Sequence, residues 1–423
     1  GTVDWITTPK TTGTFTAVSG EGYFLNTSGG VITANLPAGV AGAIVSLADY
    51  AATWQTNNVT VAPNGAEKIG SIAGNATLST EGQSVTFVYV DSTQGWINTM
   101  DSTSNARGST FICASVSGAC NTLTTAPDCS NMKIATFTGP GDFTVNSVAN
   151  CAANNQVSYM VVAGGGGAGS KSTGLGSGAG GAGGAGGFRE DKSPVTPYTA
   201  SPLDGAGAIT VTATSFPITV GGGGARDVGC STGATVGTQG GTSTFSSISS
   251  AGGGGGGGAG FPTGGTGGTG GSGGGGGAGD TIGGAGTGNT PPTSPTQGNN
   301  GGAASPSGGR SGGAGGGASG TGESGYGAGK GGAGGNGVST SITGSSIARA
   351  GGGSGGSYCT TCFSSAGTGG GGTGGYNPNV NATDGTTNTG GGGGGSAGGT
   401  PHLGTGLGGN GGSGIVIIRY KFQ

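Results

Sequence analysis

Short runs of β-branched and aromatic residues recur through the first hundred residues, and turn residues separate them. The clearest run is "SVTFVYV", which would place Val85, Phe87 and Tyr89 on one face of a strand. Sequences such as "SGEG" and "STQG" are typical of the turns between strands. We therefore expect a small β-sandwich or barrel over residues 1–103, with strands at Thr14–Val18, Tyr23–Asn26, Val31–Leu36, Ala43–Leu47, Val59–Val61, Ala76–Leu78, Ser84–Val90 and Trp96–Asn98.

The pattern changes after residue 103. Residues 104–132 carry cysteines among Ser, Thr, Ala and Asn, and we interpret them as a stapled connector. From Lys133 the segments "KIATFTGPGDFTVNS" and "NQVSYMVV" again indicate strands, and the chain closes with "GIVIIRYKF". We expect "VSYMVV" to pair with "GIVIIRY", which would clamp both ends of the glycine region between them. The expected organisation is a β domain at 1–103, a connector at 104–132 and a glycine-rich domain at 133–423.

The glycine region lies between these two strands, in a chain with 115 glycines among 423 residues. Helical periodicity is essentially missing from the sequence, so we expect almost no α-helix. A flexible linker of this length is implausible inside a compact chain, and collagen would need Gly at every third position together with much Pro. The remaining interpretation is a bundle of polyglycine-II helices, in which neighbouring backbones satisfy one another because no side chain separates them.

Local three-residue repeats favour this bundle. In "AGGAGGAGG" and "GGTGGTGGSGG", two of every three positions are Gly and the third is small. Segments of different composition, such as "YCTTCF" and "YNPNVNATDG", alternate with the glycine runs. The expected fold is therefore all-β plus polyglycine-II: a scaffold of rods, clamped by terminal strands, with variable loops at the ends of the rods.

Composition and charge limit the classes of function that the chain can have. Charged residues make up 7% of the chain and the net charge is −3, so we expect no nucleic-acid partner. The longest aliphatic run, Ile415–Ile418, is too short to span a bilayer. Seven cysteines favour disulfides and an extracellular setting. The disulfide candidates are Cys359, Cys362, Cys113, Cys120, Cys129 and Cys151.

Three motifs suggest chemistry, but a different interpretation is preferred for each. A phosphate loop needs Gly before Lys171 and a helix after it, and neither is present. The C-x-x-C at Cys359 and Cys362 could be redox-active or half of a zinc site, but a loop-closing disulfide is favoured because no helix follows and few further ligands exist. A weak calcium candidate comprises Asn377, Asn379, Asn381 and Asp384, for which an exposed turn is the preferred interpretation. We expect no cofactor and no catalytic residue.

Aromatic residues in the glycine region are few, and they fall in or beside the expected loops. Such residues serve as stacking platforms and binding hot spots, or they simply cover the rod ends. The receptor-binding candidates are Phe188, Tyr198, Phe261, Tyr326, Tyr358, Phe363, Tyr376 and His402.

The pairing of "MVVAGGGG" with "GGSGIVIIRY" resembles the glycine-rich domains of phage tail and tail-fibre proteins. The alternation of rods and loops resembles the polyglycine-II sandwich adhesins at the tips of T-even-like phage tail fibres. "GTVDWITTPK" and "TFVYVDSTQGWINT" are similar to N-terminal domains of marine phage tail fibres. The resemblance implies a virion protein that binds a host surface glycan or outer-membrane protein through its loops, without catalysis. It also implies fibre partners for the N-terminal domain, and a homotrimer or homopolymer. The alternatives are a self-assembling extracellular or virion filament and an ice-binding protein.

Overall fold

A computed structural model describes residues 2–102, 110–170, 178–228, 234–305, 310–376, 380–399 and 406–423. The chain divides into two compact units, Gly1–Gly108 and Ser109–Gln423, and each is described by itself. Within the described ranges the only helical segments are two short 3-10 turns, η1 (Thr27–Gly29) and η2 (Ala152–Asn155). The all-β expectation is therefore confirmed. None of the described residues forms an apolar helix of the length needed to cross a bilayer.

The first unit is a β-sandwich. One sheet has the order β1 (Asp4–Lys10), β3 (Glu21–Leu25), β5 (Ile44–Asp49), β8 (Ser84–Asp91) and β9 (Gly95–Ser102). The other has the order β2 (Gly13–Thr16), β4 (Ile32–Asn35), β6 (Val59–Ala62) and β7 (Ala76–Leu78).

Its core confirms the expected strand faces. Val85, Phe87 and Tyr89 of β8 pack into one apolar cluster with the fully buried Trp54 and Trp96. All eight expected strands are present, as β2 to β9. The sequence pattern missed β1, whose side chains are largely exposed because it lies at a sheet edge.

The second unit contains three sheets. The first has the order β10 (Cys113–Val116), β13 (Gly141–Ser147), β17 (Ser215–Thr219), β18 (Ser243–Phe245) and β19 (Ile248–Ser250). The second has the order β11 (Thr122–Ala126), β12 (Cys129–Phe137), β22 (Ile415–Lys421), β14 (Gln156–Val162) and β15 (Phe188–Asp191), with β16 (Ile209–Thr210) paired to β14. The third is the hairpin of β20 (Val338–Thr340) and β21 (Ile347–Arg349). The segment interpreted as a connector, 104–132, thus supplies β10, β11 and the start of β12 to this unit.

The two strands that flank the glycine region pair as expected. β14 and β22 run antiparallel, from Val162 opposite Ile415 to Ser158 opposite Arg419. Both strands are buried, because apolar clusters cover their two faces. The clamp prediction is confirmed, and it brings the beginning and the end of the glycine region to one place.

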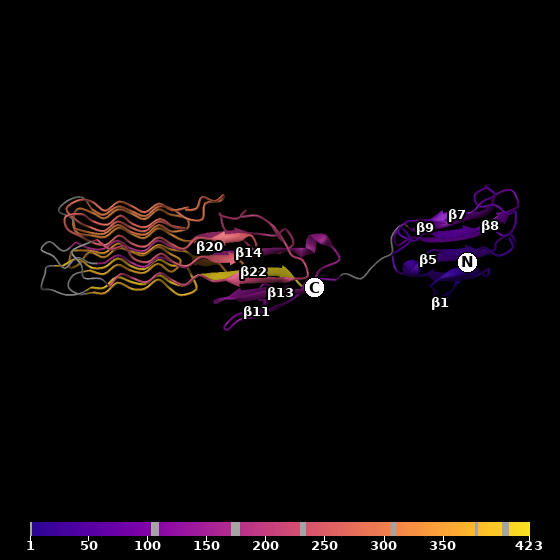
Figure 1. The fold of residues 1–423 in the computed structure, drawn as a ribbon, viewed down its shortest axis with the longest axis horizontal. Helices are drawn as coiled ribbons and strands as arrows, with labels where there is room; N and C mark the ends of the chain where they lie inside the picture. The colour runs from indigo at the N-terminus through magenta and orange to yellow at the C-terminus, as the bar shows by residue number, and fades with distance from the viewer. Residues whose placement is uncertain are drawn as a thin grey trace. The chain divides into compact units, whose positions relative to one another are not determined.

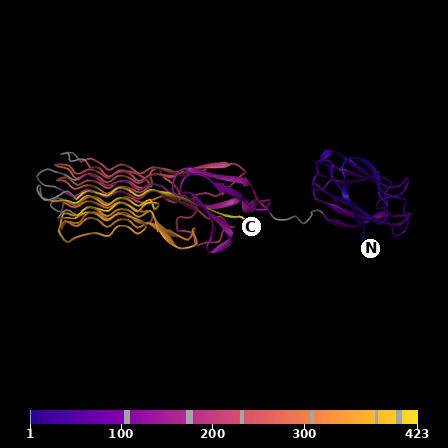
Figure 2. The same ribbon diagram turned by 90° about the horizontal axis from the view of Figure 1, so that it is seen from below.

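Between the clamp strands the chain runs back and forth as extended rods that lie side by side (Figures 1 and 2). Successive amides of rod 163–170 donate to three different neighbours in turn. The amides of Gly164, Gly165 and Gly166 donate, in that order, to rods 234–241, 406–414 and 178–187 at 3.0, 2.9 and 2.8 Å. The amides of Gly167, Ala168 and Gly169 then donate to the same three rods in the same order, at 3.0, 3.0 and 3.1 Å. A partner that recurs every third residue is the mark of the three-fold polyglycine-II helix.

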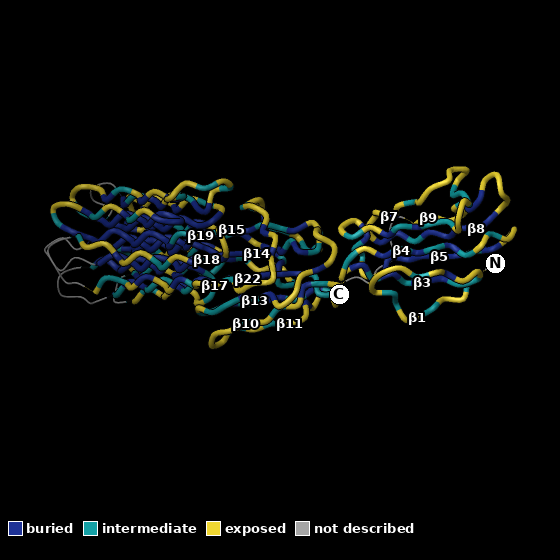
Figure 3. The backbone as a smooth tube through the Cα atoms, turned by 45° about the vertical axis from the view of Figure 1, so that its right-hand side comes forward, coloured by how far each residue is buried: buried dark blue, intermediate teal, exposed yellow. Residues whose placement is uncertain are grey.

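The carbonyls of the same rod complete its surroundings. Gly164, Gly165 and Gly166 accept from rods 251–260, 220–228 and 390–398 at 2.9, 2.8 and 3.0 Å. Three neighbours therefore receive hydrogen bonds and three others donate them, so every peptide group in this stretch is paired. We call the whole assembly of rods the glycine array. Its inner rods are buried throughout (Figure 3).

Contact between backbones explains the glycine content. A Cβ added to Gly183 would lie 1.9 Å from the carbonyl oxygen of Gly166, and one added to Gly165 would lie 2.1 Å from that of Gly391. These distances are far inside van der Waals contact, so a side chain at either position would force two rods apart.

The array has two different ends. The sheet end is where rod 163–170 leaves β14 and rod 406–414 enters β22, and the loop end is opposite. Ser170 therefore lies at the loop end, as does Ala179, which begins the rod that runs back to β15. A segment that is hydrogen-bonded to either residue therefore also lies at the loop end.

Candidate functional site

Five of the expected aromatic residues gather at the loop end. The carbonyl of Ser170 accepts from the amide of Ala259 at 2.8 Å, which brings the segment containing Phe261 to this end. The amide of Ala179 donates to the carbonyl of Arg310 at 2.9 Å. We call the following set the tip cluster: Phe261, Arg310, Tyr326, Lys330, Tyr358, Phe363 and Tyr376.

Arg310 joins two rings of the tip cluster that come from different loops. Its guanidinium carbon lies 6.0 Å from the centroid of Phe261 and 5.6 Å from that of Tyr358. Both distances are within the range of cation–π attraction. Among the described residues no carboxylate forms an ion pair with Arg310, so the rings hold the cation in a half-exposed position.

Tyr326 adds an exposed ring to the same surface. Its backbone amide donates to the carbonyl of Lys330 at 2.9 Å, and its carbonyl accepts from the amide of Gly329 at 3.2 Å. The carbonyl of Gly329 in turn accepts from the amide of Tyr358 at 2.8 Å. Lys330 lies 5.6 Å from the ring centroid of Tyr326. The Tyr326 hydroxyl donates to Glu323 at 2.8 Å, and this hydrogen bond raises the pKa of the phenol.

The disulfide Cys359–Cys362 closes the loop between Tyr358 and Phe363, as expected. Phe363 is 69% exposed and lies 6.3 Å from the ring of Tyr376, centroid to centroid. A closed loop loses less conformational entropy when it binds a partner, so the disulfide favours a preorganised contact surface.

Residues 137–421 match the family described as the glycine-rich domain. The chain belongs to this family. The matched range starts at the end of β12 and finishes at the end of β22, so it includes the clamp, the glycine array and the tip cluster. Among curated proteins, none matches the chain.

Two aromatic candidates lie at the opposite end of the glycine-rich domain. Phe188 begins β15 and is fully buried in an apolar cluster with Met160 and Ile417, so its prediction as a receptor contact is wrong. Tyr198 packs against the same cluster, and its hydroxyl donates to Glu190 at 3.2 Å. Burial raises the pKa of Tyr198. Both residues stabilise the sheet end.

Two charged residues of β15 are also buried at the sheet end. They are Arg189 and Glu190. Arg189 donates to the carbonyl of Pro295 at 2.6 Å, and Glu190 accepts from the amide of Ser201 at 3.0 Å. Hydrogen bonds to loop backbone explain how these charges tolerate burial next to the clamp.

Disulfides are not formed by the other described cysteine candidates. Cys113, Cys120, Cys129 and Cys151 carry free thiols, which corrects the prediction. Cys113 and Cys129 belong to strands of different sheets, and the thiol of Cys129 donates to Asn131 at 2.9 Å.

The structure describes two of the four residues of the calcium candidate, Asn381 and Asp384. Asn377 and Asn379 lie outside the described residues, as do His402 and Lys171. The side-chain oxygens of Asn381 and Asp384 accept the amides of Leu407 and Asn410 at 2.9 and 2.7 Å. These oxygens therefore fasten one rod to its neighbour.

Sequence reasoning missed the two cations of the tip cluster. Arg310 and Lys330 each stand alone among Gly, Ala and Ser, with no motif around them. Their only signal was position, since both lie where a glycine run is interrupted.

Proposed function

We propose that this chain is a viral tail-fibre protein of the adhesin type, which attaches to a host cell-surface receptor through the loop end of its glycine array. The receptor is a surface glycan or an outer-membrane protein, and the setting is the virion. The role is binding, without catalysis.

The observation that carries the proposal is the segregation of side chains in the second unit. The array consists of rods whose backbones satisfy one another, so it offers a rigid support with little chemistry of its own. The tip cluster concentrates exposed and half-exposed rings and two cations on loops at one end. Aromatic and arginine side chains on a rigid support are the residues that dominate protein interfaces.

Binding of labelled protein to a panel of bacterial cells tests the proposal. Tyr358→Ala and Phe363→Ala should each reduce cell binding at least about tenfold, a loss that one interface hot spot commonly causes. The control is Ile347→Ala, which removes an exposed side chain of β21 at the sheet end.

The thermal unfolding of all three variants should match that of the unchanged chain. Cell binding that persists in both tip variants would refute the loop assignment. Electron microscopy of the purified chain addresses the filament alternative, because ordered polymers formed without partner proteins would favour that function instead.

A further inference from the structure

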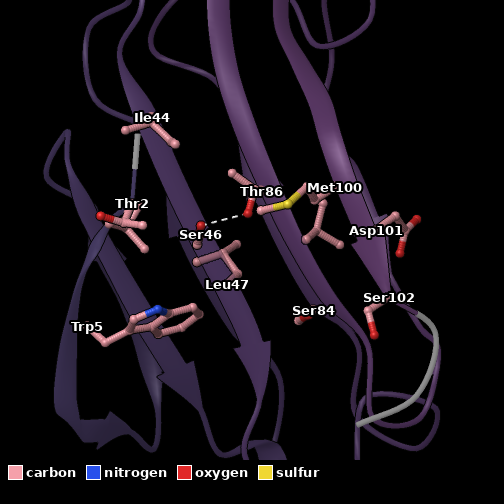
Figure 4. Close-up of a pocket in the computed structure, with 12 residues that line it drawn as sticks. Thr2, Trp5, Ile44, Ser46, Leu47, Ser84, Thr86, Met100, Asp101 and Ser102 are labelled. Carbon is pink, nitrogen blue, oxygen red and sulfur yellow. Dashed lines mark hydrogen bonds between the residues drawn. The ribbon is translucent and has the colours of Figure 1, made fainter.

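A trough lies on the outer face of the five-stranded sheet in the first unit. Its volume is about 320 Å³, within the range of small-molecule sites. Trp5 of β1 forms one wall and Met100 of β9 the other, while Ser46 of β5 and Thr86 of β8 form the floor between them (Figure 4). Most of the core side chains lie on the other face of this sheet, and Leu47 and Val85 are the core residues that also line the trough.

The Trp5 wall has the form of a stacking platform. Its ring packs over the backbone of Gly22, where an added Cβ would come within 2.7 Å of the ring carbons. Phe24 supports it from the side, with ring centroids 4.8 Å apart. The indole is 39% exposed, although a ring of this size is normally covered in a small sandwich. Met100 is 65% exposed on the opposite wall.

The floor carries hydroxyl groups. Ser46 and Thr86 share a hydrogen bond of 2.7 Å between their oxygens. Only one of the two protons is used in that bond, so the pair keeps one donor and several lone pairs. Both residues are buried beneath the walls.

The trough has no cation among its lining residues. Its single acidic residue, Asp101, already accepts from the side-chain amide of Gln83 at 3.0 Å. An anionic ligand would find no counter-charge here. A ligand with an apolar face for the indole and hydroxyls for the floor fits both surfaces.

We propose that this trough is a second binding site, for one or two units of a neutral oligosaccharide. The site belongs to the first unit, so it stands independently of the function proposed for the tip cluster.

Tryptophan emission gives a direct test on the full chain. The chain has three tryptophans, and Trp54 and Trp96 are fully buried. Titration with cellohexaose, maltohexaose and N-acetylchitohexaose should give a saturable blue shift with at least one sugar, because Trp5 loses water contact. Calorimetry on the same samples measures the affinity.

Single substitutions test whether the change in emission and the affinity come from the trough. Trp5→Ala should lower the affinity about tenfold or more, and Ser46→Ala should lower it several-fold. Tyr50→Ala is the matched control, since Tyr50 is an exposed aromatic residue of the same unit that does not line the trough. Unchanged emission from Trp54 and Trp96 in Trp5→Ala shows that the unit is folded.

Two results would overturn the proposal. One is the lack of saturable binding to any sugar of the panel, or binding that Trp5→Ala leaves unaltered. The other is a blue shift that depends on protein concentration without sugar and accompanies dimer formation, because a second copy of the chain would then cover the trough.

Discussion

Arg419 shows how one side chain fastens the clamp. It projects from β22, is fully buried, and pairs with Asp128 at 3.0 Å. It also donates to the carbonyls of Ile342 and Pro197 at 3.2 and 2.9 Å. A single guanidinium thus joins the last strand to three segments far apart in the sequence.

We expect Arg419→Met to destabilise the second unit by about 3 kcal/mol, because it leaves buried carbonyls without a donor. Asp128→Asn should cost about 1 kcal/mol or less, since Asp128 is 32% exposed and Arg419 keeps its carbonyl partners. Denaturant unfolding followed by tyrosine near-ultraviolet circular dichroism measures both. Equal losses in the two variants would contradict this account.

The stability of the second unit should depend on pH through the buried carboxyl group of Glu190. Burial raises its pKa above the usual value of 4.5, against the opposing effect of its hydrogen bonds. The folded state therefore holds the proton more tightly than the unfolded chain, and stability is lost as the pH rises from 4.5 through the folded pKa.

Glu190→Gln should remove this loss, because the amide can still accept from Ser201 and donate to the hydroxyls of Tyr198 and Thr340. The free energy of unfolding, compared between the two chains from pH 4 to 8, should diverge in favour of the variant as the pH rises. Parallel profiles would show that Glu190 is not the group responsible.

At the residue level, some contacts could be predicted from the sequence and others could not. The Cys359–Cys362 pair was predictable because its two members are close in the chain. The burial of Phe188 and Glu190 was not, since it depends on β15 pairing with β14 and on loops that arrive from more than a hundred residues away. That Trp5 and Met100 line one trough was not predictable for the same reason, because it depends on the order of the strands.

At the level of elements, strands and rods were predictable for different reasons. "SVTFVYV" and "GIVIIRY" alternate or concentrate apolar residues, which is how strands are recognised. The rods were inferred from composition and three-residue spacing, because no other structure satisfies so many glycine backbones. Which rods are neighbours was not predictable, since repeats such as "GGAGG" carry no information that distinguishes one partner from another.

Two glycines of the array provide a matched test of backbone contact. Gly183→Ala should destabilise the unit by about 3 kcal/mol, because its Cβ would lie 1.9 Å from the oxygen of Gly166. Gly222→Ala should be neutral or stabilising by about 0.5 kcal/mol, because nothing lies within 4 Å of its added Cβ and the unfolded chain loses entropy. Thermal unfolding measures both, and similar effects at the two positions would contradict direct contact between the rods.

At the scale of the molecule, the two units should unfold with different heat capacities. The first unit buries an ordinary apolar core, whereas the glycine array buries mainly peptide groups. Exposure of apolar surface raises the heat capacity and exposure of polar surface lowers it. We expect the second unit to fall well below about 12–15 cal/mol/K per residue, and the first unit to lie within that range.

Scanning calorimetry of the full chain measures both values. Tryptophan emission assigns the transitions, because all three tryptophans belong to the first unit. An ordinary value for the second unit would mean that its folding depends on apolar burial to the usual extent.

The hydrogen bonds around rod 163–170 also have a mechanical consequence. A pull on the loop end, against an anchor at the sheet end, acts along the rods and therefore across their hydrogen bonds. Such a load strains many bonds at once instead of opening them one after another. Because rod 163–170 is tied to six neighbours, tension along it spreads sideways into the array. This sharing of load is consistent with the attachment role proposed above.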